Sequence, residues 1–340
     1  MIVDAIRQLV DGENLSSDQA EAAMTEIMEG NALPSQIGAF LTALRMKGES
    51  VEEITALAGV MRRKVRPVSP GRHSELLDTC GTGGDSSGSF NISTAAALVA
   101  AGAGVAVAKH GNRSVSSLCG SADVLRELGV NIEAAPEVVE LCLDSAGICF
   151  IFAPMFHPAM KHAIGPRREM GIRTVFNVLG PLTNPAGARS QLLGVFAQSL
   201  TVTLAGVLAD LGSRKAYVVH GHGGLDEISL AGPTSLSELN DGKVTSRVIR
   251  PEEFGIEPRP TEAIAGGDAA VNAKIIREVL SGRPGACRDA VMLNAGAAIS
   301  AFHQQMDIGR GIELAAEAID SGRAGNKLEA LVKLTNGEAI

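Results

Sequence analysis

A glycine-rich segment at residues 78–94, DTCGTGGDSSGSFNIST, is the strongest chemical signal in the sequence. A short apolar run at Leu76 and Leu77 leads into it, and a helical pattern follows from about Asn91 to Ala101. Glycines let the backbone approach an anion closely, and the free N–H groups at a helix start favour phosphate. The segment therefore predicts that a phosphorylated small substrate is held between Gly81 and Gly88.

Other interpretations of this segment are weaker. Neither GxGxxG nor GxxxxGK[ST] occurs in it, so a dinucleotide-binding or Walker-type loop is not indicated. The simpler alternative is a tight turn between a strand and a helix, with Ser93 or Asn91 as the helix cap.

A second polar cluster, KHGNRSVSS, begins at Lys109 and follows an apolar run at residues 105–108. It gathers two cations, an amide and three hydroxyl groups. In an open sheet, ligands bind beyond the carboxyl ends of the strands, where this cluster would lie. A solvated basic loop is the alternative for Lys109 and Arg113. Because the cluster comes one crossover after the glycine-rich segment, we expect both loops to face one crevice.

A third cluster, HGHGGLDE at residues 220–227, places Asp226 and Glu227 after an apolar run at residues 216–219. Mg²⁺ prefers oxygen ligands and often bridges one or two carboxylates to substrate phosphates. An isolated Asp-Glu pair is more commonly a surface turn. His220 and His222 could suggest a transition metal, but no third ligand lies nearby in the sequence.

The elements that must position these clusters fall into two groups. Residues 1 to about 66 are predicted to be helical, with capping boxes at Ser16 and Ser50 and a helix start at Pro34. One helical stripe needs an apolar partner, either the rest of the chain or a second subunit. Its residues are Ile37, Phe40, Leu41 and Leu44.

The composition changes around residues 66–73, where Pro and Gly interrupt the helical pattern. Short apolar runs then alternate with helix-length stretches, which is typical of a parallel sheet with crossover helices. The expected strands lie at residues 76–80, 105–108, 148–152, 191–196 and 216–219.

The predicted fold class is therefore α/β, with two domains. A small all-helical domain at residues 1–70 is joined by helices from about 160–187. A larger domain at residues 71–159 and 188–340 has a mainly parallel central sheet flanked by helices. The stretch 159–185 is broken by Gly and Pro, and the tail at 266–334 has helical periodicity.

Composition narrows the possible functions. The 340 residues are 45% hydrophobic, enough for a sizeable core, and the formal charge of −8 gives no general attraction for nucleic acid or an anionic membrane. The 5 cysteines are widely spread and include no CxxC pair, so we expect them to be reduced. The amino terminus does not resemble a signal peptide, and no uninterrupted apolar run reaches the roughly 18 residues of a membrane span. A cytoplasmic location is predicted.

Taken together and in order, six segments resemble the anthranilate phosphoribosyltransferase family of tryptophan biosynthesis, over nearly the whole chain. They are DTCGTGGD, FNIST, KHGNRSVSS with GSADVLRELG, GIRTVFNVLGPLTNP, GLDEISL and a late GGDAAVNA. The resemblance implies a nucleoside phosphorylase-like fold and transfer of phosphoribose from 5-phosphoribosyl 1-pyrophosphate (PRPP) to anthranilate. It also implies a Mg²⁺ cofactor and a homodimer formed through the helical domains.

The resemblance also implies roles for individual residues. Lys109, Asp226 and Glu227 are expected to be catalytic, and Ser93, Asp226 and Glu227 to hold magnesium. Anthranilate is expected to contact Gly81, His110, Asn112, His157 and Arg167, with Arg168 as an open alternative to Arg167. The expected donor-binding residues are Gly81, Gly84, Asp85, Ser89, Asn91, Ile92, Ser93, Thr94, Lys109, His110, Gly111, Asn112, Arg113, Ser114, Val115, Ser116, Ser117 and Ser121.

These residue types suit the implied reaction. Displacement at the sugar's anomeric carbon mainly requires stabilisation of the departing pyrophosphate, which magnesium, Lys109 and backbone N–H groups can supply. The aromatic amine is already neutral and needs positioning more than deprotonation. Arg167 can meet a carboxylate through its planar fork.

The chain departs from the family pattern at few positions. Ser86, Ser87 and Ser89 stand where Gly or Thr is frequent, and Leu118 stands where Lys is common. The change at Leu118 puts an extra cationic contact there in doubt, and neither change affects the expected metal ligands.

Two other functions compete with this one. A pyrimidine nucleoside phosphorylase shares the fold, but KHGNR and GLDEIS favour the transferase. A relative that has lost catalysis and binds nucleic acid should be basic and lack Asp226, Glu227 or Arg167, whereas this chain is acidic and has all three. Cys80 has no indicated partner for nucleophilic catalysis and is expected to be a packed residue.

Overall fold

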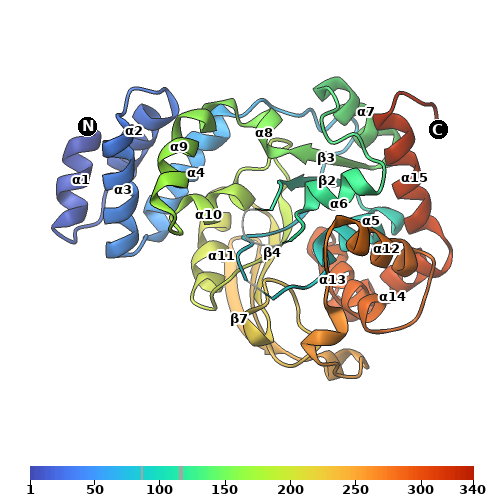
Figure 1. The fold of residues 1–340 in the computed structure, drawn as a ribbon. Helices are drawn as coiled ribbons and strands as arrows, with labels where there is room; N and C mark the ends of the chain where they lie inside the picture. The colour runs from blue at the N-terminus through green and yellow to red at the C-terminus, as the bar shows by residue number, and fades with distance from the viewer. Residues whose placement is uncertain (86, 115–117) are drawn as a thin grey trace.

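The computed structural model describes residues 1–85, 87–114 and 118–340. Helices near the amino terminus form one end of the molecule, and a sheet covered by helices forms the rest (Figure 1). The amino and carboxyl termini lie at opposite ends.

The first four helices begin where the sequence places their caps. Ser16 and Ser50 accept hydrogen bonds from the backbone N–H groups of Gln19 and Glu53 in two capping boxes, and Pro34 opens the third helix. The helices are α1 (Ile2–Val10), α2 (Ser17–Met28), α3 (Pro34–Lys47) and α4 (Val51–Lys64).

The apolar stripe on α3 is buried within the chain itself. Phe40 and Leu44 are both fully buried, in a cluster that also includes Leu193 and Val218 of the sheet. Of the two partners that the sequence left open, the rest of the chain therefore covers this stripe.

The sheet has seven strands in the order β3-β2-β1-β4-β5-β6-β7. Strands β1 to β5 form only parallel pairs with one another. Strand β6 is antiparallel to β5, and β7 is antiparallel to β6. The strands are β1 (Leu77–Gly81), β2 (Val107–Gly111), β3 (Ile148–Phe152), β4 (Ser190–Gly194), β5 (Lys215–His220), β6 (Thr234–Asn240) and β7 (Lys243–Ile249). The five predicted strands are confirmed to within three residues at each end, and the mainly parallel sheet is confirmed as well.

The hairpin of β6 and β7 was not predicted. Its turn is Asp241-Gly242, with φ angles of 47° and 78°, the geometry of a tight two-residue hairpin. A DG pair between two alternating runs was the signal that could have revealed it.

Helices cover both faces of the sheet. Successive side chains of a strand point to opposite faces, and both faces carry apolar side chains that must be buried. Leu192 and Val219 pack into the core under α5 and α13, whereas Leu193 and Val218 pack toward α11 and the amino-terminal helices. The helices of the larger part are α5 (Ile92–Gly102), α6 (Ser121–Glu127), α7 (Pro136–Ala146), α11 (Leu200–Asp210), α12 (Ala269–Leu280), α13 (Ala286–Phe302), α14 (Ile308–Asp320) and α15 (Arg323–Thr335).

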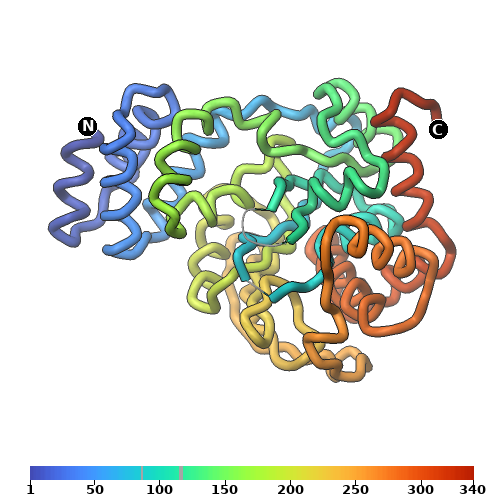
Figure 2. Tube along the Cα trace, viewed as in Figure 1, coloured from blue at the N-terminus to red at the C-terminus, as the bar shows by residue number. Residues whose placement is uncertain are grey.

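The segment after β3 returns to the amino-terminal helices, as the sequence suggested. It contains α8 (Ala153–Phe156), α9 (Lys161–Met170) and α10 (Phe176–Leu179). Helix α9 packs against α2 and α3, and Figure 2 shows this green stretch beside the blue amino-terminal trace. The expected break at Gly165 and Pro166 is wrong, because α9 continues through both with Pro166 buried. The exact domain boundaries stay a prediction.

Among the described residues, none of the helices combines the length and the apolar character that crossing a membrane requires.

A buried ion pair ties α3 to α4. Lys47 Nζ lies 2.8 Å from Glu53 Oε2, and the two side chains are 5% and 0% exposed. The same carboxylate accepts hydrogen bonds from the backbone N–H groups of Leu15 and Ser50 at 2.9 and 2.8 Å. Glu53 therefore joins three segments of the helical part.

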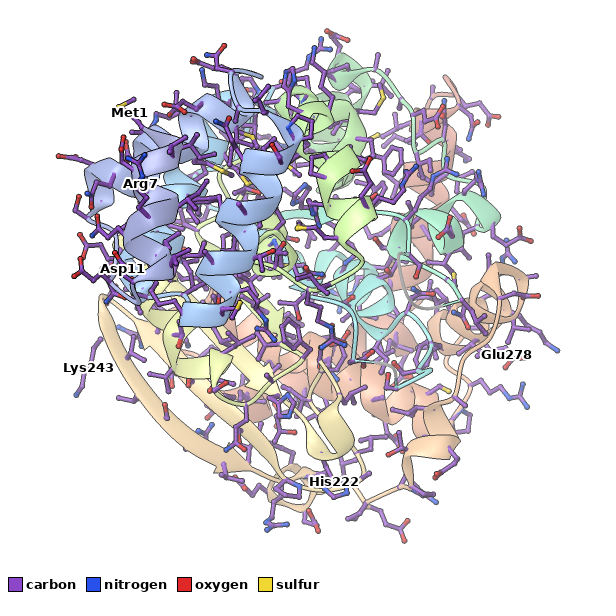
Figure 3. The ribbon with its side chains drawn as sticks, turned by 60° about the vertical axis from the view of Figure 1, so that its left-hand side comes forward. Met1, Arg7, Asp11, His222, Lys243 and Glu278 are labelled. Atoms are coloured by element: carbon purple, nitrogen blue, oxygen red, sulfur yellow. The ribbon has the colours of Figure 1, made fainter. Side chains whose placement is uncertain are left out.

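We predict that Lys47→Met lowers the free energy of unfolding by about 3 kcal/mol, because it leaves the Glu53 charge buried without its partner. The control is Arg7→Met, which breaks an ion pair with Asp4 whose side chains are both 73% exposed; Arg7 lies on the outside of the molecule (Figure 3). This control should cost less than about 1 kcal/mol. Urea unfolding followed by circular dichroism measures both, and equal effects would contradict the role given to Glu53.

Candidate active site

Two of the three predicted loops contact each other directly at the carboxyl ends of the parallel strands. Asp226 follows β5, yet its Oδ2 accepts a hydrogen bond of 2.9 Å from the N–H of Gly83, which follows β1. Strand β4 lies between β1 and β5. The Asp226 side chain therefore reaches across β4 to the glycine loop, by which we mean residues 81–85.

Two glycines make this close approach possible. Gly81 and Gly194 are register partners at the ends of β1 and β4. A methyl group on Gly194 would lie 1.5 Å from the carbonyl oxygen of Asp226, and one on Gly81 would lie 2.4 Å from Asp226 Oδ2. A side chain at Gly194 would displace the Asp226 backbone, and a side chain at Gly81 would displace the Asp226 carboxylate that contacts the glycine loop.

Glu227 lies at the start of α5. It is 8% exposed, and its Oε1 accepts a hydrogen bond of 3.1 Å from the N–H of Ser93. A carboxylate at this position is favoured by the free N–H groups and dipole of the helix start. Ser93 and Glu227, two of the three expected metal ligands, are therefore in direct contact through the Ser93 backbone.

Burial and neighbouring negative charge raise the pKa of both carboxyl groups that follow β5. Burial, and then the charge of Asp85, raise the pKa of Asp226 to about 7. Burial and the charge of Asp226 raise the pKa of Glu227 well above its usual value. Such a cluster of negative charge favours a bound cation.

The donor set fits a magnesium ion. Carboxylate and hydroxyl oxygens are the ligands that this ion prefers, and it commonly takes only one or two carboxylates from the protein. Within the described ranges, no three His, Cys, Asp or Glu residues form a closed metal cage. An ion held by Asp226 and Glu227 would thus complete its shell with other oxygens.

Asn91 does not cap α5 with its side chain, although it occupies the N-cap position. Its amide nitrogen donates to Cys119 O at 3.1 Å, and its amide oxygen accepts from Asn272 at 2.9 Å. These bonds tie the start of α5 to α12 and to Cys119, which lies in the loop between β2 and α6; we call this loop the second polar loop. The simple capped turn is therefore the wrong description of this segment.

The late GGDAAVNA segment supports the end of the glycine-rich segment. Gly266 N donates to Gly88 O at 2.8 Å, and Ser89 forms an isolated antiparallel bridge with Ala265. The hydroxyl groups of Ser87 and Ser89 are 3.1 Å apart. Thr94 and Ile92 are buried in the first turn of α5.

Lys109 is buried, at 3% exposed, and its ammonium group donates to Thr79 O on β1 at 2.5 Å. Burial lowers its pKa, while the nearby charges of Asp78 and Glu227 oppose that shift. The solvated-loop interpretation is therefore wrong for Lys109. Arg113 is exposed, with its guanidinium 3.5 Å from Glu133 and 5.7 Å from the Phe152 ring centre.

His110 and His157 are brought together from β2 and the end of α8. Their Nε2 atoms are 3.0 Å apart and their ring centres 4.9 Å apart. Burial lowers the pKa of His110 to about 3 and that of His157 to about 4. Both rings are therefore neutral at pH 7, and one donates a hydrogen bond to the other.

The second polar loop is closed on the start of α6. Asn112 O accepts from Ser121 Oγ and from the Ala122 N–H, both at 3.2 Å. Asp123 Oδ2 accepts from the N–H groups of Ser114 and Gly120 at 3.3 and 3.0 Å. Four predicted or discussed positions lie outside the described residues: Ser86, Val115, Ser116 and Ser117.

Arg167 and Arg168 differ in their surroundings. The Arg167 guanidinium lies 4.9 Å from the Phe176 ring centre and is partly buried, whereas Arg168 is exposed. Burial lowers the pKa of Arg167. A partly desolvated guanidinium on an aromatic ring is the better carboxylate site of the two.

Other candidates do not belong to this arrangement. His222 is exposed at the surface (Figure 3), and His220 Nδ1 lies 2.8 Å from Val195 O, so the two rings do not form a metal pair. Burial raises the pKa of the Cys80 thiol well above its usual value, which disfavours a nucleophile. A surface groove of about 590 Å³ between α11 and the β6–β7 hairpin contains none of the predicted site residues.

Comparison with known proteins gives matches over the whole chain. The helical bundle domain of a glycosyl transferase family matches residues 3–65, and the a/b domain of that family matches residues 73–325. An anthranilate phosphoribosyltransferase from Pelotomaculum thermopropionicum is 55% identical over 98% of this chain and 97% of its own. The chain belongs to the anthranilate phosphoribosyltransferase family.

Solved structures agree with this assignment. The anthranilate phosphoribosyltransferase from Thermus thermophilus has a TM-score of 0.93 at 44% identity, covering 98% of this chain and 100% of its own. The Saccharomyces cerevisiae enzyme in complex with PRPP and Mg has a TM-score of 0.89 at 30% identity, covering 98% of each chain. The predicted family and the predicted fold class are confirmed.

Sequence reasoning missed two residues that hold this phosphoribosyltransferase site together. The buried Asp78 carboxylate accepts from the His110 N–H at 3.1 Å and from Asn184 Nδ2 at 2.7 Å. Asn184 also donates to Ala108 O at 2.8 Å. Burial raises the pKa of Asp78 to about 6. The available signal was an aspartate inside an apolar strand, which requires buried partners.

We predict that His157→Gln makes stability less sensitive to acid. The unfolded chain binds a proton at His157 near the ordinary pKa of 6.5, whereas the folded chain does so only near pH 4. The wild type should therefore lose roughly 2 kcal/mol from this residue between pH 7 and pH 5, and the variant should not. Urea unfolding at both pH values measures the difference, with the exposed His222→Gln as control. Parallel pH curves for all three proteins would contradict the prediction.

Proposed function

We propose that this chain transfers the phosphoribosyl group of PRPP to the amine of anthranilate, giving N-(5-phosphoribosyl)anthranilate and pyrophosphate. This is the reaction of its family in tryptophan biosynthesis. The observation that carries the proposal is the hydrogen bond from Gly83 to Asp226, because it joins a phosphate-binding loop to the acidic pair in one site. The complex of the yeast relative with PRPP and Mg supports it.

PRPP is proposed to bind between the glycine loop, the start of α5 and the second polar loop. Backbone N–H groups in glycine-rich turns and at helix starts suit the charge of its phosphates. Lys109 carries three N–H donors, of which Thr79 O takes one. Its charge supports the pyrophosphate end of the donor. Arg113 after β2 and Ser121 at the start of α6 are proposed to contact the donor as well.

Magnesium is proposed to be held by Asp226 and Glu227, with Ser93 beside them. When bound, it would supply positive charge that neutralises the departing pyrophosphate. The fit rests on the oxygen donors and on the raised pKa values of both carboxyl groups.

Anthranilate is proposed to bind on the side of Arg167, His110 and His157, with Asn112 and Gly81 nearby. Its carboxylate needs a cation, and neutral imidazoles supply none, so the carboxylate is assigned to Arg167. The two neutral rings would instead contact the aromatic body of the substrate and orient its amine.

The chemical step follows from these positions. The amine nitrogen of anthranilate attacks the anomeric carbon of PRPP, and the bond from that carbon to the pyrophosphate oxygen breaks. The amine then loses one proton to solvent. Because the attacking amine is already neutral, holding it close to the anomeric carbon is the main contribution of the acceptor side.

The competing functions have less support. The matched relatives are anthranilate phosphoribosyltransferases, which leaves the pyrimidine nucleoside phosphorylase without a supporting observation. Asp226, Glu227 and Arg167 are all present and the net charge is −8, which disfavours a nucleic-acid-binding descendant. A homodimer through the helical part and a cytoplasmic location are proposed from the family resemblance.

We predict that Asp226→Asn combined with Glu227→Gln reduces turnover by about a hundredfold or more, since both changes remove charge at the magnesium site while keeping the side-chain shape. Loss of anthranilate fluorescence with PRPP present measures turnover over a range of magnesium concentrations. The matched control, Asp11→Asn with Glu338→Gln, alters two exposed carboxylates. A normal magnesium dependence in the site variant would refute these roles, and no magnesium-dependent fluorescence loss in the wild type would refute the function.

We predict that Arg167→Lys raises the KM for anthranilate about tenfold, because lysine cannot form the paired hydrogen bonds of a guanidinium with a carboxylate. Arg168→Lys is the matched control and should leave this KM within about twofold of wild type. Steady-state kinetics at saturating PRPP measures both. The reverse result would transfer carboxylate binding to Arg168.

A further inference from the structure

Arg173 connects the end of α9 to the glycine loop. It follows Gly171, the residue that ends α9, and its Nη2 donates a hydrogen bond to the carbonyl oxygen of Gly84. A methyl group on Gly84 would lie 3.5 Å from Arg173 Nε, so the guanidinium runs along the loop itself. A residue 89 positions away in the sequence thus holds the loop carbonyl.

Phe196 supports this contact with its aromatic ring. Its ring centre lies 4.7 Å from the Arg173 guanidinium carbon, a distance suited to a cation–π interaction. Its backbone N–H donates to Thr82 Oγ1 at 3.1 Å, and the Thr82 N–H donates to Gly194 O at 2.9 Å. Phe196 therefore contacts the Arg173 guanidinium with its ring and holds Thr82, at the start of the glycine loop, with its backbone.

The glycine loop needs such external support. Gly83 and Gly84 have φ angles of 65° and 74°, and glycine loses more conformational freedom on ordering than any other residue. One other anchor is the bond from the Gly83 N–H to Asp226. Asp226 is also a proposed magnesium ligand, whereas Arg173 and Phe196 are side-chain and backbone anchors that do not take part in the proposed chemistry.

We propose that Arg173, seated on Phe196, is a positioning residue that holds the glycine loop in its donor-binding conformation and ties it to helix α9. The inference rests on the proposed function, in which this loop binds PRPP. Ordering the loop before the donor arrives reduces the entropy lost on binding, so the effect falls on donor affinity. The same helix carries Arg167, the proposed anthranilate residue.

The contact is more than surface packing. An arginine lying on an exposed ring would stabilise the fold slightly and leave the loop unchanged. Here the guanidinium also donates to the carbonyl oxygen of Gly84. The N–H of the preceding residue, Gly83, donates to the proposed catalytic carboxylate of Asp226. The two roles therefore predict different kinetic results.

The first test is the kinetics of Arg173→Met, which keeps much of the apolar stem but removes the donor. We expect the KM for PRPP to rise about tenfold, while kcat and the KM for anthranilate stay within about twofold of wild type. Arg173→Lys can still donate to Gly84 O and should recover part of the loss. Arg250→Met alters an exposed arginine elsewhere and is the matched control. An unchanged KM for PRPP in Arg173→Met would overturn the inference while leaving the proposed function intact.

The second test does not depend on turnover. Hydrogen exchange of a peptide spanning residues 78–90 is compared in wild type, Arg173→Met and Phe196→Leu, all without substrate. Faster exchange at the glycine loop in both variants, with unchanged exchange in the sheet, supports the positioning role of Arg173. Wild-type exchange rates in both variants would overturn it, even if the wild type showed no transferase activity.

Discussion

The site depends on the contact of the Asp226 segment with the glycine loop across β4. Gly81 and Gly194 make room for this contact because they face it without side chains, so a side chain that follows β5 can reach the loop that follows β1. It brings a negative carboxylate to the loop that is proposed to bind a negative donor. That conflict is resolved if a divalent cation lies between them, which agrees with the raised pKa values of Asp226 and Glu227.

The burial pattern supports this arrangement. Lys109 on β2 and Asp78 on β1 are both buried, and the charge of each lowers the free-energy cost of burying the other. Asp78 also holds the backbone of His110 through a hydrogen bond from its N–H. His110 and His157 are buried as a neutral pair. Charge is thus concentrated where the donor is proposed to bind, and the residues proposed to bind the acceptor are neutral except for Arg167. This division suits a polyanionic donor and an aromatic acceptor with a single carboxylate.

The helical part is continuous with the core of the sheet, and this has a functional consequence. Helices α4 and α11 share one apolar cluster, and α9 packs on α2 and α3 while carrying Arg167. Arg173 then connects the end of α9 to the glycine loop. The proposed acceptor residue, the proposed donor loop and the amino-terminal helices are therefore connected through α9 and the segment that follows it.

The sequence by itself determined the features that depend on neighbouring residues. Capping boxes, the five parallel strands, the glycine turn and the ordered family motifs are all encoded within short stretches, because caps and turns involve residues only a few positions apart. Tertiary structure decided the rest. The bonds from Gly83 to Asp226, His110 to His157 and Arg173 to Gly84 join residues 143, 47 and 89 positions apart. Such pairings follow from strand order and helix packing, which no local pattern specifies.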